Sequence, residues 1–337
     1  LPRLFGFTEY ADVTRLLEEA GFARTGRHPL RPGAAYHWFT YDWRRDLVES
    51  ARRLGEALDE LADSLGDPQA RFNLVGHSMG GLVARYYLRY GAAEPDTPVT
   101  WAGARRVRSL VLAAVPCSGS IPALDTLLSG SRVGLSSTTL SVATVASMPS
   151  LYQLLPPPGT HPLATLDGQL LDEDLHDPAT WERHGWGAWA PARRRAAEIE
   201  EGLPEPTQFR AFATAALHRA RAFHEALARP PQLPCPVPVV LMGGDCLPTL
   251  ARALVGGRPG TPPRFDAWTR AEARFMFEAG DGRVTRASLL GSHLPEAEHG
   301  DTGSGWPEVG QAFFGEADHH GIYGEATPAE AQELSEE

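Results

Sequence analysis

The chain has 337 residues, 42% of them hydrophobic, and a formal net charge of -11 at pH 7. This length and apolar content suffice for one large α/β domain with an insertion, or for two ordinary domains, and they exclude global disorder. The negative charge argues against nucleic acid as a main partner, and weakly against anionic membrane surfaces.

Residue usage excludes further classes of chemistry. All 31 basic residues are Arg and none is Lys, which rules out Schiff-base lysines, lysine-bound pyridoxal phosphate and a P-loop. Cys117, Cys235 and Cys246 lack metal-ligand spacing, although one Cys235–Cys246 bridge stays open. No apolar run reaches the roughly 18 residues that span a bilayer, and no signal peptide is visible. We therefore expect no cofactor and no transmembrane segment.

Hydrophobic periodicity predicts alternating strands and helices in the first part of the chain. The expected elements are a helix over 8–21, a strand over 36–41, an amphipathic helix over 47–65, a strand over 71–75, a helix over 82–90 and a strand over 107–115. The last run is almost continuously apolar, which is typical of a strand buried on both faces. This alternation favours a mostly parallel sheet with helices on both faces.

The pattern changes near residue 157. From there to residue 236 no buried strand is expected, and the segment holds Trp181, Trp186, Trp189 and a helix over 207–228. Long excursions from a compact core are usually functional, so this segment is predicted to be a cap. Strands over 237–242 and 275–277 should rejoin the sheet. The expected organisation is therefore a core over 1–156, a cap over 157–236, a second part of the core over 237–326 and an acidic tail over 327–337.

The motif Gly76-x-Ser78-x-Gly80 is the sharpest local signal. A strand precedes it and a helix follows it, as in a nucleophile elbow, which lifts a serine hydroxyl above the edge of a sheet. The glycines are expected because side chains two residues on either side of the serine would clash with neighbouring elements. The pattern predicts Ser78 as a nucleophile; the alternative is a Gly-rich structural turn with an inert serine.

A nucleophilic serine needs a base and an acid that orients the base. In this fold the acid follows the serine, and the histidine follows the acid. Asp245 and Asp281 are the candidate acids, and both also suit ordinary turns. His319 and His320 are the candidate bases.

Other histidines are weaker candidates. His293 and His299 are flanked by polar loop residues. Together with Asp301 and His319 they also suggest a metal cluster. Their spacing matches no compact ligand motif, so we expect no metal.

Several motifs occur along the chain in a set order: Tyr41-Asp42-Trp43-Arg44, the elbow string Gly76–Tyr86, Pro116-Cys117-Ser118-Gly119-Ser120, residues 149–156, Gly280-Asp281-Gly282-Arg283-Val284 and the histidine pair near the C-terminus. Many lipases share the elbow string, but the ordered combination resembles the lecithin:cholesterol acyltransferase-like lipases. The resemblance spans most of the chain. It implies an α/β-hydrolase fold, in which a mostly parallel sheet is flanked by helices and carries a helical cap insertion.

The resemblance implies roles for three residues. Ser78 is the nucleophile, and Asp281 is the acid because the family's acid lies in a Gly-Asp-Gly-x-Val motif. His319 is favoured as the base because the family's histidine has an aliphatic residue three positions later, here Ile322. The family acts on acyl esters of lipids and transfers the acyl group to water or to an alcohol.

Two features depart from the family pattern. Family members carry a strand and a glycine-containing loop before the first helix, and that loop supplies one oxyanion donor. Neither is found from Leu1 onward, so the first strand or strands are expected to be missing. The Met79 N–H is the one donor that we assign, and losing one such donor typically costs about 10²–10³ in rate. Arg283 stands where the family has threonine.

Three residues are predicted to contact substrate. Trp43 can pack beside the active site, with Asp42 capping the helix that starts there. Cys117 and Ser118 follow a strand's carboxyl end, where ligands bind in open α/β sheets. Cys117 is not a candidate nucleophile, because no histidine lies near it in the sequence.

The predicted function is a serine esterase, lipase or O-acyltransferase that works through a Ser-His-Asp triad and an acyl-enzyme. The expected partner is a lipid or another acyl ester, with peripheral lipid contact through the cap. The tryptophans of the cap suggest an apolar substrate, or else form the cap's own core. The alternatives are a non-catalytic binding protein of the same fold, and a thioesterase or amidase with the same triad.

Overall fold

The computed structural model describes residues 11–25, 35–132, 139–190, 205–256, 260–294 and 304–323. Its helices are α1 (Ala11–Glu19), α2 (Leu47–Ser64), α3 (Met79–Tyr90), α4 (Ile121–Ser129), α5 (Val142–Ala146), α6 (Pro149–Tyr152), α7 (Pro178–His184), α9 (Pro206–Ala228), α10 (Arg270–Met276) and α11 (Arg286–Leu290), with 3-10 turns η1 (Ala102–Arg105) and η2 (Gly187–Trp189). Its strands are β1 (Ala23–Arg24), β2 (Ala35–Tyr36), β3 (Phe72–His77), β4 (Val107–Ala113), β5 (Ser131–Arg132), β6 (Thr139–Leu140), β7 (Leu163–Thr165), β8 (Leu170–Leu171), β9 (Val239–Gly244), β10 (Leu247–Leu250), β11 (Ala253–Val255), β12 (Phe277–Gly280) and β13 (Gln311–Gly315).

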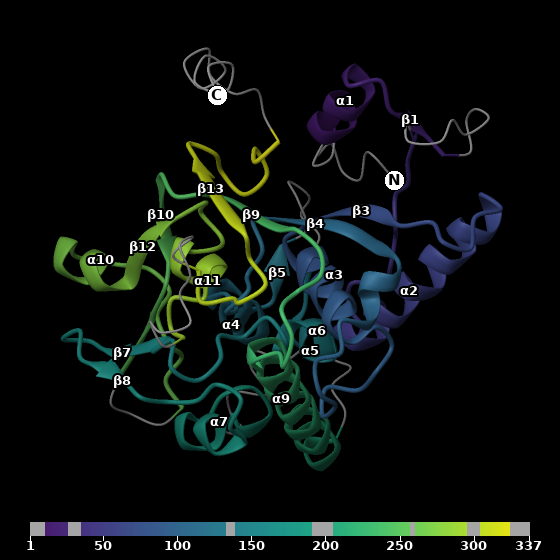
Figure 1. Cartoon of the computed structure of the whole chain (residues 1–337). Helices are drawn as coiled ribbons and strands as arrows, with labels where there is room; N and C mark the ends of the chain where they lie inside the picture. Colours follow the sequence, from purple (N-terminus) through teal and green to yellow (C-terminus); the bar gives the residue numbers. More distant parts are fainter. Residues whose placement is uncertain are drawn as a thin grey trace.

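A parallel sheet with strand order β13-β9-β4-β3 forms the centre of the fold. On one face, Leu110 and Leu112 of β4 are fully buried, and α3 packs against β3 and β4 on top of them. Figure 1 shows α2 and α3 on the same side of this sheet. The fold is therefore a mostly parallel sheet flanked by helices, as expected.

The other face of the sheet is more open than expected. Val75 on β3 is 56% exposed and Phe313 on β13 is 55% exposed. On β4, Val111 is paired in register with Val75 and is only partly buried. The prediction that β4 is buried on both faces was therefore wrong for part of the strand, because the described helices do not cover this face near these residues.

Helix α2 shows how the sequence defines an element of the core. Leu47, Leu54 and Leu58 recur on one face and are buried. Asp46 caps the helix, because its carboxylate accepts the backbone N–H of Val48 at 2.8 Å. The cap is thus Asp46 and not Asp42. The strand expected over 36–41 is also shorter, since β2 ends at Tyr36.

Asp42 has another partner. Its two carboxylate oxygens accept hydrogen bonds from Nε and Nη2 of Arg44, each at 2.7 Å. This bidentate pair leaves Asp42 in the turn ahead of α2 and not at its N-terminus.

The segment over 157–236 contains strands, contrary to the prediction. Leu163 and Ala164 of β7 are fully buried. β7 pairs in parallel with β11 and antiparallel with β8. The partner strand β11 comes some 90 residues later in the chain, so no local pattern marks the pairing.

The helix predicted over 207–228 is α9, which is long and lies at the far side of the molecule from the sheet (Figure 1). Trp181 and Trp186 pack with Phe209 and Leu217 of α9 in a second hydrophobic cluster. Trp189 is partly buried against the same cluster. Of the two interpretations of these tryptophans, the structure therefore supports a core role.

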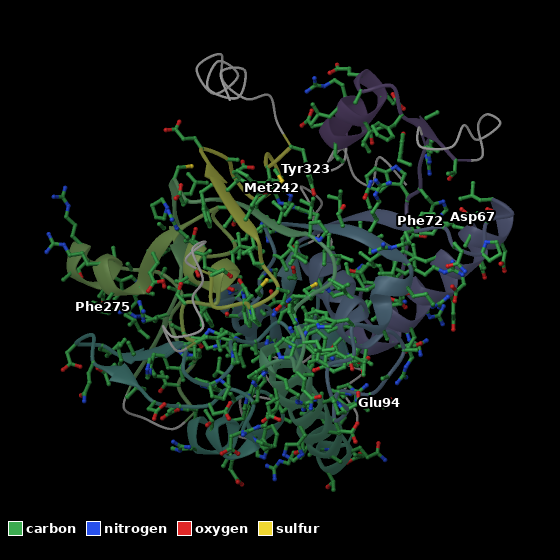
Figure 2. All side chains as sticks on the ribbon, viewed as in Figure 1. Asp67, Phe72, Glu94, Met242, Phe275 and Tyr323 are labelled. Carbon is green, nitrogen blue, oxygen red and sulfur yellow. The ribbon has the colours of Figure 1, made fainter. Side chains whose placement is uncertain are left out.

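The chain after residue 244 differs from the prediction in two ways. Residues 270–276 form α10, and β12 pairs antiparallel with β10 without joining the central sheet. Phe275, near the C-terminal end of α10, lies at the edge of the molecule (Figure 2). Gly168 approaches it so closely that a Cβ there would lie 2.9 Å from the Phe275 ring. The strand that does join the sheet is β13, which was not predicted.

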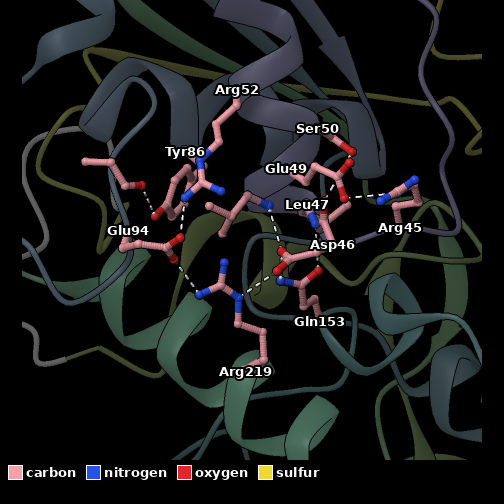
Figure 3. A network of polar contacts seen from close by, with 12 residues as sticks. Arg45, Asp46, Leu47, Glu49, Ser50, Arg52, Tyr86, Glu94, Gln153 and Arg219 are labelled. Carbon is pink, nitrogen blue, oxygen red and sulfur yellow. Dashed lines mark hydrogen bonds and ion pairs between the residues drawn. The ribbon is translucent and has the colours of Figure 1, made fainter. Parts of the chain in front are cut away.

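A polar network joins α9 to α2 (Figure 3). Arg219 on α9 donates to Asp46 at 2.6 Å and to Glu94 at 2.7 Å. The Gln153 side chain donates to Asp46 at 2.9 Å and accepts the Leu47 N–H at 2.8 Å. The residue that caps α2 therefore also holds α9 in place.

Two further observations concern the cysteines and the membrane. Cys117, Cys235 and Cys246 are all free thiols, so the Cys235–Cys246 bridge that the sequence left open is not formed. Within the described residues, no helix is both long and apolar enough to cross a bilayer. The acidic tail over 327–337 lies outside the described residues.

Candidate active site

Ser78 occupies the turn between β3 and α3 at the carboxyl edge of the sheet. Its backbone has φ 50° and ψ -131°, a conformation that residues other than glycine rarely adopt. Its N–H donates to the Ala113 carbonyl at 2.9 Å, and its carbonyl accepts the Gly81 N–H at 2.9 Å. Neighbouring elements therefore hold the strained residue in place, with its hydroxyl at the end of the sheet.

Two glycines allow this turn. A Cβ at Gly76 would lie 2.6 Å from the Gly81 Cα, and one at Gly81 would lie 2.1 Å from a methyl carbon of Val115. A Cβ at Gly80 would meet only the Tyr41 hydroxyl, at 3.8 Å. The sequence argument was therefore wrong about Gly80, because its Cβ direction is open and Gly81 is the crowded position.

The structure brings Ser78, His319 and Asp281 into hydrogen-bond contact. His319 Nε2 lies 3.0 Å from Ser78 Oγ, and His319 Nδ1 lies 2.8 Å from Asp281 Oδ2. Since a carboxylate can only accept, Nδ1 carries the hydrogen, and in the neutral ring Nε2 is left to accept the serine proton. His319 and Asp281 are both buried.

The loop around Asp281 keeps its carboxylate charged. Burial alone would raise the pKa of Asp281, but the hydrogen bond and the electrostatic interaction with His319 outweigh this effect, and the pKa is lowered. The backbone N–H groups of Arg283 and Val284 donate to Oδ1 at 2.9 and 2.7 Å and lower the pKa further. The acid is thus ionised at neutral pH.

The alternative acid Asp245 and the alternative base His320 have other partners. Asp245 pairs with Arg286 at 2.6 Å. His320 is exposed, and its backbone N–H donates to Asp318. The two ring nitrogens of His319 contact Asp281 and Ser78, so the acid that orients the ring is Asp281 and not Asp245.

The metal hypothesis concerned four residues. His293 lies against Ser118, with 3.1 Å between Nδ1 and Oγ. His299 and Asp301 fall outside the described residues. In the part of the chain that the structure covers, no three His, Cys, Asp or Glu side chains are grouped to hold a metal ion.

Met79, the predicted oxyanion donor, is the first residue of α3. The N–H groups in the first turn of a helix have no acceptor within that helix, and they form its positive end. This position places a backbone donor directly after Ser78.

The residues assigned to substrate binding have different surroundings. Trp43 lies in the turn before α2 and is 45% exposed. Cys117 is fully buried in the main hydrophobic cluster, and burial raises the pKa of its thiol to about 11. Ser118 is buried beside His293. The substrate role of all three stays a prediction, and for Cys117 the core position gives a sufficient reason for its residue type.

Sequence reasoning missed two residues that support the site. His77 lies 2.9 Å, through Nε2, from the His319 carbonyl oxygen. Thr249 Oγ1 accepts the Gly282 N–H at 2.8 Å, beside the acid. The position of His77 next to Ser78 was an available signal, whereas Thr249 reaches the site only through the pairing of β10 with β12.

The sheet and the strained serine turn define an α/β-hydrolase fold. The sequence matches the family model described as lecithin:cholesterol acyltransferase over residues 9–181, just over half of the chain. The chain therefore belongs to the lecithin:cholesterol acyltransferase family, which places it in general among the acyl-ester hydrolases and acyltransferases. The matched range includes Ser78 but ends before Asp281 and His319.

Solved structures resemble the chain at low sequence identity. A chain of the Tle4-Tli4 complex has a TM-score of 0.56 and 17% identity, with 92% of this chain and 71% of that chain covered. The lipase BlEst2 of Bacillus licheniformis has a TM-score of 0.34 and 12% identity, with 86% of this chain and 73% of the lipase covered. The phospholipase PlaB of Legionella pneumophila has a TM-score of 0.33 and 14% identity, with 70% of this chain and 36% of the phospholipase covered. The first likeness extends to the fold alone. A comparison with curated proteins found no match.

Proposed function

We propose that this protein is a serine esterase, lipase or O-acyltransferase that acts on lipid acyl esters through Ser78, His319 and Asp281. One observation carries the proposal: a single imidazole bridges the Ser78 hydroxyl at 3.0 Å and the Asp281 carboxylate at 2.8 Å. A base must lie within hydrogen-bond reach of the proton that it removes. Family membership supplies the substrate class.

The reaction would proceed in two steps. His319 Nε2 accepts the Ser78 proton as Oγ attacks the ester carbonyl, and the Met79 N–H donates to the oxyanion. His319 then gives the proton to the alcohol as it departs, and the acyl group stays bound to Ser78. Water or an acceptor alcohol attacks the acyl-serine, with His319 again as base, and the serine is regenerated. Asp281 stays charged and stabilises the imidazolium.

The segment over 157–236 is proposed to act as a cap that shapes the acyl site. α9 from this segment is held against the core by the Arg219 contacts to Asp46 and Glu94. The buried tryptophans stabilise the segment itself. Peripheral contact of the cap with a lipid surface belongs to the same proposal.

A fluorophosphonate probe tests the assignment of the nucleophile. We expect the wild-type chain to be labelled and Ser78→Ala to be unlabelled, while Ser50→Ala, a buried serine of α2 outside the site, is labelled at the wild-type rate. Absence of labelling in the wild-type chain would leave a non-catalytic protein of the same fold as the better proposal. Rates on nitrophenyl esters of short and long acyl chains, with and without a long-chain alcohol, then separate esterase, lipase and transferase activity. Faster turnover of matched thioesters or amides would favour the alternative enzyme class.

A further inference from the structure

The side chain of His77 links the strand before the nucleophile to the loop that carries the base. His77 is the last residue of β3 and directly precedes Ser78. Its Nε2 lies 2.9 Å from the backbone carbonyl oxygen of His319. Because a carbonyl oxygen can only accept, Nε2 must carry a hydrogen and donate it.

The loop around His319 needs such an anchor. After β13 ends at Gly315, residues 316–323 contain no helix or strand. Within this stretch the backbone of His319 has two anchors: its N–H donates to the Asp281 carbonyl at 2.9 Å, and its carbonyl accepts from His77. One anchor comes from the acid loop and the other from the nucleophile strand. The backbone that carries the base is thus tied to both of its partners.

The surroundings of His77 suit a fixed neutral donor. His77 is partly buried, and its ring lies 5.0 Å from the His319 ring and 5.7 Å from the Tyr323 ring, centroid to centroid. Burial lowers the pKa of His77 to about 4. The charged or titratable groups that act on it are His319, His320 and Asp281. A neutral ring with its hydrogen on Nε2 gives one defined contact at neutral pH.

We infer that His77 is a positioning residue, which sets the place of the His319 ring relative to Ser78 through its hydrogen bond to the His319 carbonyl. This inference rests on the proposed function. A base misplaced by about 1 Å can cost on the order of 100-fold in rate. Removal of the donor should therefore lower the rate of the chemical step without weakening substrate binding.

His77→Gln and His77→Met form a matched pair of variants. Both side chains are unbranched and similar in length, but only Gln offers an N–H donor at the reach of Nε2. We expect His77→Met to lose about 10- to 100-fold in kcat and in the rate of fluorophosphonate labelling, with KM within about threefold. We expect His77→Gln to stay within about threefold of the wild type, since the contact can form again.

Several outcomes overturn the inference. If the wild type is labelled and both variants react equally fast, the contact has no positioning role. The same holds if His77→Met lowers only the melting temperature while kcat per labelled site is unchanged. A wild-type chain that is not labelled overturns the proposed function, and this inference with it. If neither variant folds, NMR of histidine-labelled wild type decides: an Nδ1–H tautomer at His77 contradicts the contact, and an Nε2–H tautomer supports it.

Discussion

Asp281 contacts His319 through both its side chain and its backbone. The imidazole Nδ1 lies 2.8 Å from Asp281 Oδ2, and the His319 N–H donates to the Asp281 carbonyl oxygen at 2.9 Å. The first contact fixes which ring nitrogen carries the hydrogen. The second fixes the backbone from which the ring projects. Both depend on the loop after β12 keeping its shape.

Asp281→Asn should abolish most of the activity while the fold is retained. The amide can present its N–H to Nδ1 and so stabilise the wrong tautomer, and comparable changes in serine hydrolases cost about 10⁴ in kcat. Asp245→Asn is the matched control, because it removes an exposed ion pair with Arg286 and should leave kcat within about twofold. Steady-state rates on a soluble ester measure both. Equal losses in the two variants would contradict the assignment of the acid.

His319→Ala and His320→Ala separate the two neighbouring histidines. His319 lies between Ser78 and Asp281, whereas His320 is exposed and its backbone N–H donates to Asp318. We expect His319→Ala to lose at least about 10³ in kcat and His320→Ala to keep most of it. Circular dichroism before each assay shows whether the variants are folded. A larger loss in His320→Ala would reverse the assignment.

The sequence predicted the elements with long or regular patterns. The leucine spacing of α2 and the apolar run of β4 are local signals, and so is the Gly-x-Ser-x-Gly turn. The carboxyl-end placement of Ser78 follows from a strand that leads directly into a helix. These features could be predicted from the sequence because each depends on a local pattern of about 20 residues or fewer.

Elements that depend on pairing between distant parts of the chain could not be predicted from local sequence patterns. β7 is three residues long, and its partner β11 lies far along the chain. Short apolar runs do not distinguish strand from helix, so the run over 275–277 predicts a strand of the central sheet, although α10 extends to Met276. A signal for α10 was present: Thr269 and Glu272 form a capping box. For the cap of α2, the sequence pattern indicated Asp42, whereas the carboxylate that accepts the Val48 N–H belongs to Asp46, four residues later.

Gly81→Ala should destabilise the elbow more than Gly80→Ala. A methyl group at position 81 would lie 2.1 Å from Val115 Cγ2, and Val115 cannot rotate both of its methyl groups away. We expect Gly81→Ala to lose about 1–3 kcal/mol in the free energy of unfolding, with slower labelling of Ser78. Gly80→Ala should change stability by no more than about 1 kcal/mol.

Val115→Ala provides the test of mechanism for this pair. It removes the two carbons that the new methyl group would meet, at 2.1 and 3.0 Å. If crowding is the cause, the double variant Gly81→Ala/Val115→Ala is less destabilised than the sum of the single variants, by about 1 kcal/mol or more. Urea denaturation measures all three. If the losses in the free energy of unfolding are additive, the destabilisation of Gly81→Ala comes from the backbone and not from contact with Val115.

Glu308→Gln should be strongly destabilising. The Glu308 carboxylate accepts from Arg85 at 2.7 Å and from Arg89 at 2.9 Å, and all three side chains are fully buried. Burial raises the pKa of Glu308, but the two guanidinium groups outweigh it and lower the pKa. Removing the charge leaves two buried cations uncompensated, which costs about 3–5 kcal/mol. Glu49→Gln, which breaks an exposed pair with Arg45, should cost under about 0.5 kcal/mol. Equal effects in urea denaturation would show that the Glu308 charge is not required.

The protein should become less stable as the pH falls from about 7 to about 4.5, before its carboxylates titrate. Burial lowers the pKa of His77, His224 and His293 to about 4, against an ordinary value of 6.5. Below 6.5 the unfolded chain binds protons at these histidines and the folded chain does not. The stabilisation is therefore complete above 6.5 and is lost as the pH falls towards 4, at about 1.4 kcal/mol per pH unit for each histidine.

His224→Gln isolates one of these contributions. The amide can still donate to the Gln153 carbonyl that His224 Nε2 contacts at 2.9 Å, but it does not titrate. We expect the slope of unfolding free energy against pH to decrease by about 1.4 kcal/mol per unit in this range. His218→Gln, on an exposed position of the same helix, should leave the slope unchanged. Urea denaturation at four or five pH values measures the slopes. A slope that His224→Gln does not change would mean that His224 is protonated in the folded protein, because a neutral buried histidine must contribute to it.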